Sequence, residues 1–255
     1  MATLIDAFPL FSTLRDAVFL TATVNEVEEL RPRMRRIRFS GPRLQELRWT
    51  PGQHVRLQVA GLLESVLRLH PDHALRTYSI YNTDPDLGAL DIVMFDHDGD
   101  REAATPASRW AKGVSIGDQA HFTRPQGNFV IRHDAPYHVF AGEETASVAF
   151  AAMLRSLHPT AEVHGVIEAA TDTDHLSLAR PLTQVERGDA SATNSAVLAD
   201  ALRNLQLPDY PGIAYLAGEA RTIQTLRKIL ITERGWDRRQ IHTKPFWTPA
   251  RTGME

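Results

Sequence analysis

The run Arg76-Thr77-Tyr78-Ser79 combines side chains that suit a ligand carrying both a flat ring and phosphates. An arginine guanidinium is a fixed fork of donors that matches a pyrophosphate. A tyrosine offers a flat aromatic face to a ring, and the two hydroxyls can bond ring or phosphate oxygens. The same residues also occur in an ordinary strand with an exposed arginine, so the run by itself leaves both interpretations open.

Other kinds of chemistry have little support in this chain. It contains no cysteine, which excludes thiolate zinc sites, cysteine-ligated iron–sulfur clusters and cysteine nucleophiles. Any redox chemistry must therefore come from a bound cofactor. His70 and His73 have a metal-like spacing, but Pro71 lies between them and no paired glutamate accompanies them, so we expect no metal site. The sequence also shows no Ser-His-Asp elbow and no P-loop.

Charge and hydropathy restrict the binding partners and the cellular location that the sequence allows. The 28 Lys and Arg residues against 31 Asp and Glu leave a net charge of -3, which removes any argument for nucleic-acid binding through bulk positive charge. The arginines within residues 31–38 would split between the two faces of a strand, which favours a solvated strand. No secretory signal and no apolar stretch of about 18 residues is present. We expect a cytoplasmic protein without membrane insertion.

The residues up to about position 133 have the pattern of short strands separated by turns. Residues 54–59 alternate apolar and polar side chains, which indicates a half-buried strand. Three other segments favour strands (34–39, 76–81 and 90–95), and Pro106 begins a short helix over 106–112. Many short strands of this kind indicate an antiparallel barrel or sandwich.

From about residue 134 the chain alternates between strands and helices. Strands are predicted at 137–141, 162–168 and 212–217, and helices at 147–157, at 196–205 and after Gly218. This alternation favours a parallel sheet with crossover helices. Its ligand site should lie at the carboxyl ends of the strands, near Gly142 and Gly218.

The motifs in their order along the chain resemble a known family. Pro51-Gly52-Gln53-His54 followed by Arg76-Thr77-Tyr78-Ser79 resembles the ferredoxin-reductase-like flavoproteins. Further runs make the chain similar to the siderophore-interacting proteins, the FAD-dependent ferric-siderophore reductases: His97 with residues 106–111 and Gly117-Asp118, then residues 141–146, then residues 216–220 with 233–236 and Phe246-Trp247. The resemblance covers about residues 20 to 248.

This resemblance implies a fold and a set of FAD contacts. The fold would be an antiparallel six-stranded FAD-binding β-barrel over residues 1–133 and a parallel-sheet, NAD(P)H-binding α/β domain over residues 134–255. The residues implied to hold FAD are Arg76, Thr77, Tyr78, Ser79, His97, Ala107 and Ser108. Glu144, Thr145, Gly218 and Glu219 would border the crevice shared by the flavin and the nicotinamide. Trp110 is expected in the core.

Capture of an anionic ferric siderophore would need cationic groups near the flavin. Lys244 precedes Phe246-Trp247, where the family places a basic and aromatic edge of its pocket, and Arg48 and Arg56 are further candidates. The electron donor, NADH or NADPH, is weakly encoded. Glu168 could bond a ribose 2′-hydroxyl and so favour NADH, or it could be a solvated acid at a strand end.

The implied activity is electron transfer from NAD(P)H through FAD to chelated Fe(III), with release of Fe(II). Hydride transfer to a flavin depends on geometry more than on acid–base groups, so no catalytic side chain is assigned. One alternative is a flavin reductase component that feeds a partner protein. Another is a non-enzymatic siderophore- or flavin-binding module. It is suggested by residues 98–105, which are longer and more acidic than the family's link and end in Thr105.

Overall fold

The protein consists of two compact units. The computed structural model describes residues 19–60, 75–96 and 105–249. The first unit, called the barrel unit, comprises Met1–Glu29, Arg35–Trp49 and His54–Gln126. The second unit, called the sheet unit, comprises Leu30–Met34, Thr50–Gln53 and Gly127–Glu255. His97 and the His70/His73 pair lie outside the described residues. The domain boundary expected between residues 133 and 134 stays a prediction.

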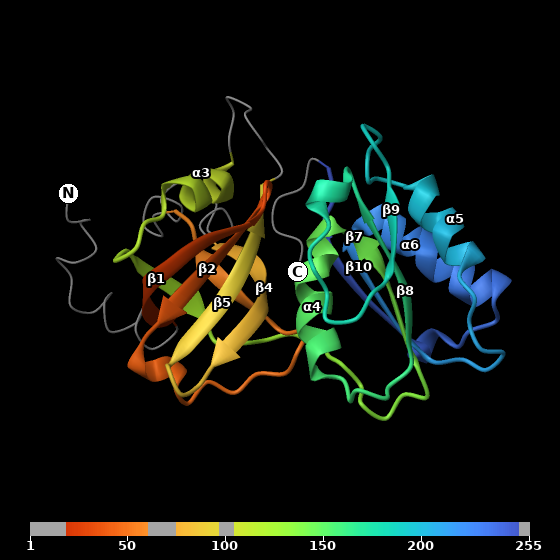
Figure 1. Cartoon of the computed structure of the whole chain (residues 1–255), viewed down its shortest axis with the longest axis horizontal. Coiled ribbons are helices and arrows are strands. Elements are labelled where there is room, and N and C mark those ends of the chain that lie inside the picture. The colour runs from red at the N-terminus through yellow and green to blue at the C-terminus, as the bar shows by residue number, and fades with distance from the viewer. Residues whose placement is uncertain (1–18, 61–74, 97–104, 250–255) are drawn as a thin grey trace. The chain divides into compact units, whose positions relative to one another are not determined.

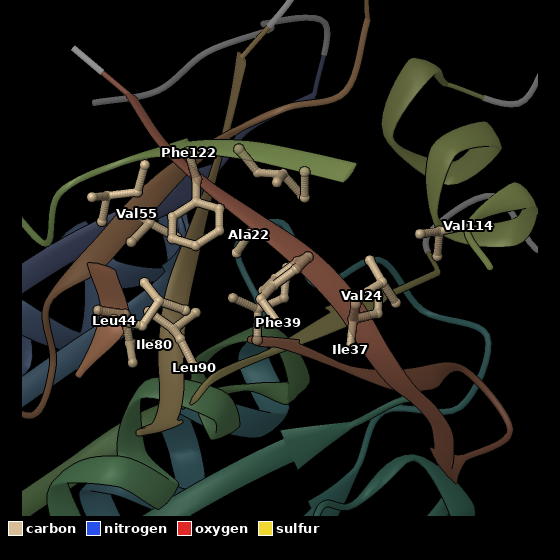
Figure 2. Packing of buried hydrophobic residues seen from close by; sticks show 14 of the residues in the cluster. Ala22, Val24, Ile37, Phe39, Leu44, Val55, Ile80, Leu90, Val114 and Phe122 are labelled. Atoms are coloured by element: carbon tan, nitrogen blue, oxygen red, sulfur yellow. The ribbon is translucent and has the colours of Figure 1, made fainter. Parts of the chain in front are cut away.

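The barrel unit contains a closed six-stranded antiparallel barrel, as expected. Its strands follow the order β1-β2-β5-β4-β3-β6. Their bounds are β1 Phe19–Arg31, β2 Met34–Ser40, β3 His54–Gln58, β4 Leu75–Asp84, β5 Ala89–Phe95 and β6 Gln119–Thr123. Alternate side chains point into the barrel because successive residues of a strand face opposite sides. Figure 2 shows Ile37, Phe39, Val55, Ile80 and Phe122 converging on this core.

One helix of the barrel unit, α3 (Pro106–Gly113), begins at a capped end. Thr105 is the N-cap, and its hydroxyl accepts a hydrogen bond from the Ser108 backbone N–H at 3.2 Å. Trp110 packs against the barrel core, with its ring centroid 6.5 Å from that of Phe39. Trp110 is therefore half-buried at the edge of the core rather than inside it.

The arginine-rich strand β2 differs from the solvated strand that its sequence favours. Arg38 forms a two-pronged pair with the buried carboxylate of Asp91, at 2.7 and 2.8 Å. Arg36 is paired with Glu26 and Glu28 on β1. The neighbouring strands supply acids opposite these arginines, so β2 is half-buried and ion-paired; its expected solvation is wrong.

The sheet unit is a parallel five-stranded sheet in the order β11-β10-β7-β8-β9. The strands are β7 His138–Glu143, β8 Val163–Ala169, β9 Thr183–Glu186, β10 Ile213–Glu219 and β11 Ile241–Trp247, and the helices are α4 Ser147–Ser156, α5 Ala196–Asn204 and α6 Ala220–Lys228. Helix α4 covers one face, and α5 and α6 cover the other (Figure 1). Among the described residues, every helix is too short or too polar to cross a bilayer.

The order of the strands creates a switch point between β7 and β10. From β7 the chain builds outward through β8 and β9, then returns to place β10 and β11 on the other side. Crossover connections therefore leave the β7–β10 junction in opposite directions. In open α/β sheets, ligands bind outside the carboxyl ends of the strands at such a point. This topology makes the carboxyl ends of β7 and β10 the candidate ligand site of the sheet unit.

Candidate functional site

The Arg76–Ser79 run lies on β4 of the barrel unit, paired antiparallel with β3. Tyr78 lies opposite Val55 and packs against the barrel core, and burial raises the pKa of its hydroxyl above the ordinary value. Thr77 and Ser79 lie opposite Arg56 and His54 and therefore share the other face. The run is divided between two faces of one strand.

The outer face of β3 keeps one unsatisfied polar atom near this run. Gln58 donates from its amide nitrogen to the Ala60 carbonyl at 3.1 Å, but its Oε1 is buried and has no hydrogen-bond partner. A buried acceptor without a donor is costly. A ligand with polar N–H groups would satisfy it, and the flavin ring is such a ligand.

The first turn of α3 carries Ala107 and Ser108 in the same unit. A helix N-terminus offers N–H groups to phosphate. Here the Thr105 hydroxyl already accepts a hydrogen bond from the Ser108 backbone N–H. The hydroxyls of Thr105 and Ser108 are also hydrogen-bonded to each other, at 3.1 Å. Thr105 therefore occupies one of the backbone N–H donors, that of Ser108, that were expected to bind an FAD phosphate.

At the switch point of the sheet unit, the structure brings Glu143, Thr145, Gly218 and Trp247 together. Glu143 Oε1 accepts from the Trp247 indole N–H at 2.9 Å and from the Thr145 hydroxyl, and Oε2 accepts from the Thr145 backbone N–H at 2.9 Å. Gly218 has a φ of 125°, and a Cβ there would lie 2.6 Å from Glu143 Oε1. Glycine at position 218 therefore leaves the space that the carboxyl group occupies.

Glu143 is a buried acid with an unusual affinity for protons. Burial raises its pKa to about 7, and the neighbouring Glu144 adds to the rise, against the hydrogen bonds from Thr145 and Trp247. The carboxyl group is therefore expected to change charge near neutral pH. Such groups at a ligand-binding edge are candidates for function.

Replacing Glu143 with glutamine should change how stability depends on pH. Because the folded pKa is above the value of 4.5 in the unfolded chain, the contribution of Glu143 is fully present below about pH 4.5 and is lost as pH rises through about 7. The Glu143→Gln variant has no carboxyl group to ionise at this position, so its stability does not fall in this way as pH rises. Its melting temperature relative to wild type should rise by roughly 5 °C between about pH 5.5 and pH 8. Thermal unfolding at each pH measures this.

The control for that experiment is Glu46→Gln, which removes a carboxylate from an exposed position of the barrel unit. Its melting temperature should track that of wild type at every pH. If the difference between Glu143→Gln and wild type stays constant across the range, Glu143 does not titrate as described.

Beside the switch point, Arg187 joins two buried glutamates. Its Nη1 donates to Glu144 Oε2 at 2.5 Å and lies 3.4 Å from Glu168 Oε1, while Nη2 donates to the other oxygen of Glu144. Glu168 also accepts from the Ser195 hydroxyl, which caps α5. Burial raises the pKa of Glu168, against the Ser195 hydrogen bond and the charge of Arg187.

Neither role considered for Glu168 fits this geometry. Its side chain is fully buried, and both carboxylate oxygens are engaged by Arg187 and Ser195. It is not a solvated acid, and with 0% of its side chain exposed it is out of reach of a ribose hydroxyl in this structure. Arg187 and Ser195 lie 19 and 27 residues from Glu168 in the chain, and sequence spacing alone could not reveal this pairing.

Glu219, at the end of β10, is occupied in capping α6. One carboxylate oxygen accepts from the Arg221 and Thr222 N–H groups at 2.9 Å, and the other accepts from the Thr248 hydroxyl at 3.0 Å. Glu219 therefore fixes the start of α6 and the segment after β11 at the switch point. Its role toward a cofactor remains a proposal.

The three cations considered for siderophore capture lie on different elements. Lys244 is half-buried on β11, opposite Ala217 of β10 and next to the switch point. Arg56 is half-buried on β3, and Arg48 is exposed on the segment before β3. Lys244 belongs to the sheet unit, and Arg48 and Arg56 belong to the barrel unit.

The comparisons with known proteins agree with the two folds. Residues 63–129 match the model of the siderophore-interacting FAD-binding domain, and residues 135–250 match that of the siderophore-interacting protein. Together these two matches span most of the chain.

Relatives and solved structures point the same way. The ferric vibriobactin reductase ViuB of Vibrio cholerae is 26% identical over 211 residues, covering 77% of this chain and 76% of ViuB. A siderophore utilization protein from T. fusca has a TM-score of 0.77 at 23% identity, covering 93% of this chain and 95% of that one. The fold is also that of the ferredoxin-NADP+ reductase from Plasmodium falciparum, with a TM-score of 0.70 at 13% identity, covering 89% of this chain and 96% of that one. The chain belongs to the siderophore-interacting protein family.

Proposed function

We propose that this protein is an FAD-dependent ferric-siderophore reductase that takes electrons from NAD(P)H. The observation that carries the proposal is the switch point of the sheet unit, where Gly142 and Gly218 lie at the carboxyl ends of adjacent parallel strands. The match of residues 63–129 to an FAD-binding domain supplies the cofactor. The 26% identity to a ferric vibriobactin reductase supports a ferric siderophore as the class of substrate.

FAD would be held by the barrel unit. Tyr78 would offer its ring, Arg76 and the first turn of α3 at Ala107 and Ser108 would bind phosphates, and Thr77 and Ser79 would bond the ring system. The buried, unpaired Gln58 Oε1 fits a ligand with N–H donors. His97 completes the proposed set outside the described residues. Bound FAD would supply the conversion of one two-electron hydride transfer into two one-electron reductions of Fe(III).

The sheet unit would hold the nicotinamide donor. Thr145, Gly218 and Glu219 form the edge of the switch point, and Glu144 is fixed there by Arg187. Their contribution is to orient the donor and to exclude water, which is what hydride transfer requires. Iron leaves because Fe(II) is held more weakly than Fe(III) by the hard oxygen donors of a siderophore.

The visible absorption spectrum of the purified protein, before and after incubation with FAD, tests the cofactor. Anaerobic addition of NADH or NADPH should then bleach the flavin bands, and a ferric chelate should restore them and release Fe(II) to a chromogenic chelator. A protein that retains no FAD would refute the proposal. Reoxidation that requires an added protein would favour the partner-fed reductase, and retained flavin that neither nicotinamide reduces would favour the binding module.

Lys244 is proposed to attract the anionic chelate. Replacing it with alanine should raise the apparent KM for an anionic ferric chelate several-fold, because an attractive charge of this kind contributes about 1 kcal/mol. Flavin reduction by NAD(P)H should be spared. Steady-state chelate reduction and stopped-flow flavin reduction separate the two, and an unchanged KM would remove Lys244 from the site. Lys228→Ala on α6 is a control with the same change of charge.

A further inference from the structure

Arg187 stands at the carboxyl end of β9, next to the end of β8. Its backbone N–H donates to the Ala169 carbonyl at 3.0 Å, immediately after β8. In dinucleotide-binding α/β sheets, the end of the second strand faces the ribose 2′ position, where an acid binds the hydroxyl of NADH or an arginine accepts the 2′-phosphate of NADPH. Arg187 and Glu168 occupy this place together.

The guanidinium of Arg187 offers no accessible fork to a phosphate, because its end-on fork is occupied and its side chain is only 9% exposed. Both Nη groups are committed to Glu144, and Nη1 also lies 3.4 Å from Glu168. The remaining donors are the second N–H of Nη2 and Nε, and Nε is buried without a partner. To bind a phosphate, Arg187 would have to release Glu144, whose side chain is 3% exposed. A carboxylate left alone at that depth is strongly unfavourable.

The surrounding charges also oppose a further anion. The carboxylates around this strand edge are Glu144, Glu168, Asp172, Asp174 and Glu186, and the arginines bonded there are Arg31, Arg33 and Arg187. Arg33 pairs with Asp174, and Arg31 donates to the His175 carbonyl. Burial lowers the pKa of His175, so this side chain adds no charge at neutral pH.

We infer that Arg187, locked by Glu144 and Glu168, is a specificity-determining residue that makes NADH rather than NADPH the electron donor. The inference rests on the proposed function, since it assumes a nicotinamide dinucleotide at the switch point. The physical reason is charge: the 2′-phosphate of NADPH carries between -1 and -2 near neutral pH. At this strand edge it would lie among more carboxylates than arginines, with no available guanidinium fork to bind it.

The test compares wild type with Glu144→Gln, which releases the Arg187 fork while keeping the shape of the side chain. In the FAD-loaded wild type, kcat/KM for flavin reduction should be about tenfold or more higher with NADH than with NADPH. In Glu144→Gln the NADPH/NADH ratio should rise by about tenfold. A general loss of activity would not move this ratio. Calorimetry with 2′,5′-ADP and 5′-ADP gives the same comparison without turnover, and the variant should gain affinity for 2′,5′-ADP.

The control is Asp209→Asn, which removes an exposed carboxylate from another part of the sheet unit. It should leave the ratio within about twofold of wild type. Three results would overturn the inference: wild type prefers NADPH, the two variants shift the ratio equally, or neither ADP compound binds. The iron half of the proposed function is checked separately, by asking whether dithionite-reduced holoprotein reduces a ferric chelate. A positive answer there with no nucleotide binding would leave the reductase standing with a different donor.

Discussion

Replacing Arg187 with methionine should lower the free energy of unfolding by about 3–5 kcal/mol near pH 8. The substitution keeps an unbranched apolar stem but leaves Glu144 and Glu168, whose side chains are 3% and 0% exposed, without their cation. Removing one partner of a buried ion pair is far more damaging than the net value of the pair, because the remaining charge can no longer be compensated. Chemical denaturation monitored by circular dichroism measures the loss.

The same variant should recover part of its stability in acid. Burial already raises the pKa of Glu168, and removing Arg187 takes away a charge that opposes this rise. The folded variant therefore binds protons more readily than the unfolded chain, so its deficit should shrink as pH falls from about 8 to about 5.

Arg203→Met is the matched control, because Arg203 pairs with Asp200 and Glu233 at an exposed position. Surface pairs of this kind contribute about 1 kcal/mol or less. Equal losses in the two variants would show that the Arg187 pairs are no more important than a surface contact.

Replacing Gly142 with alanine should destabilise the sheet unit by about 3 kcal/mol and abolish nucleotide binding at the switch point. A Cβ at this position would lie 2.3 Å from the Ala217 carbonyl oxygen and 2.6 Å from the Ala146 Cβ. The first of these atoms belongs to the backbone of β10, so β7 and β10 would have to separate where they meet. Denaturant unfolding measures the stability, and calorimetry with 5′-ADP measures the binding.

Gly113→Ala provides the comparison, since a Cβ at the end of α3 would meet nothing within 4 Å. Alanine also reduces the freedom of the unfolded chain, so this variant should be unchanged or about 0.5 kcal/mol more stable. If Gly142→Ala behaves like Gly113→Ala, the close approach of the two strands does not restrict position 142.

Much of the fold follows from local patterns of side chains. The strand β3 and the helices α4 and α5 lie where periodicity predicts them, because each pattern repeats within a few residues. The edge strands β9 and β11 have no such pattern: β9 is four residues long, and β11 contains Lys244 and Pro245. An edge strand can be short, and it tolerates proline because one side of its backbone needs no partner. Pairing with the adjacent strands β8 and β10, rather than a local pattern, therefore reveals β9 and β11.

The candidate site divides in the same way. Glu144, Thr145, Gly218 and Glu219 could be assigned to one edge from the sequence, because parallel strands bring their carboxyl ends together. The role of Trp247 toward Glu143 could not, although Phe246-Trp247 stands out as an aromatic pair near the chain's end. The two residues are 104 positions apart, and the register of β10 and β11 decides their contact.

The sequence by itself therefore determined the two fold classes and excluded cysteine-based redox chemistry, since these depend on periodicity, topology rules and composition. It also predicted that a ligand would lie at the strand ends. Only the tertiary structure decided the state of each charged group. It placed Glu143 where burial raises its pKa to about 7, and it locked Arg187 between Glu144 and Glu168. Side-chain charge depends on solvent exposure and on distances of a few ångströms between residues far apart in the chain, which no local pattern contains.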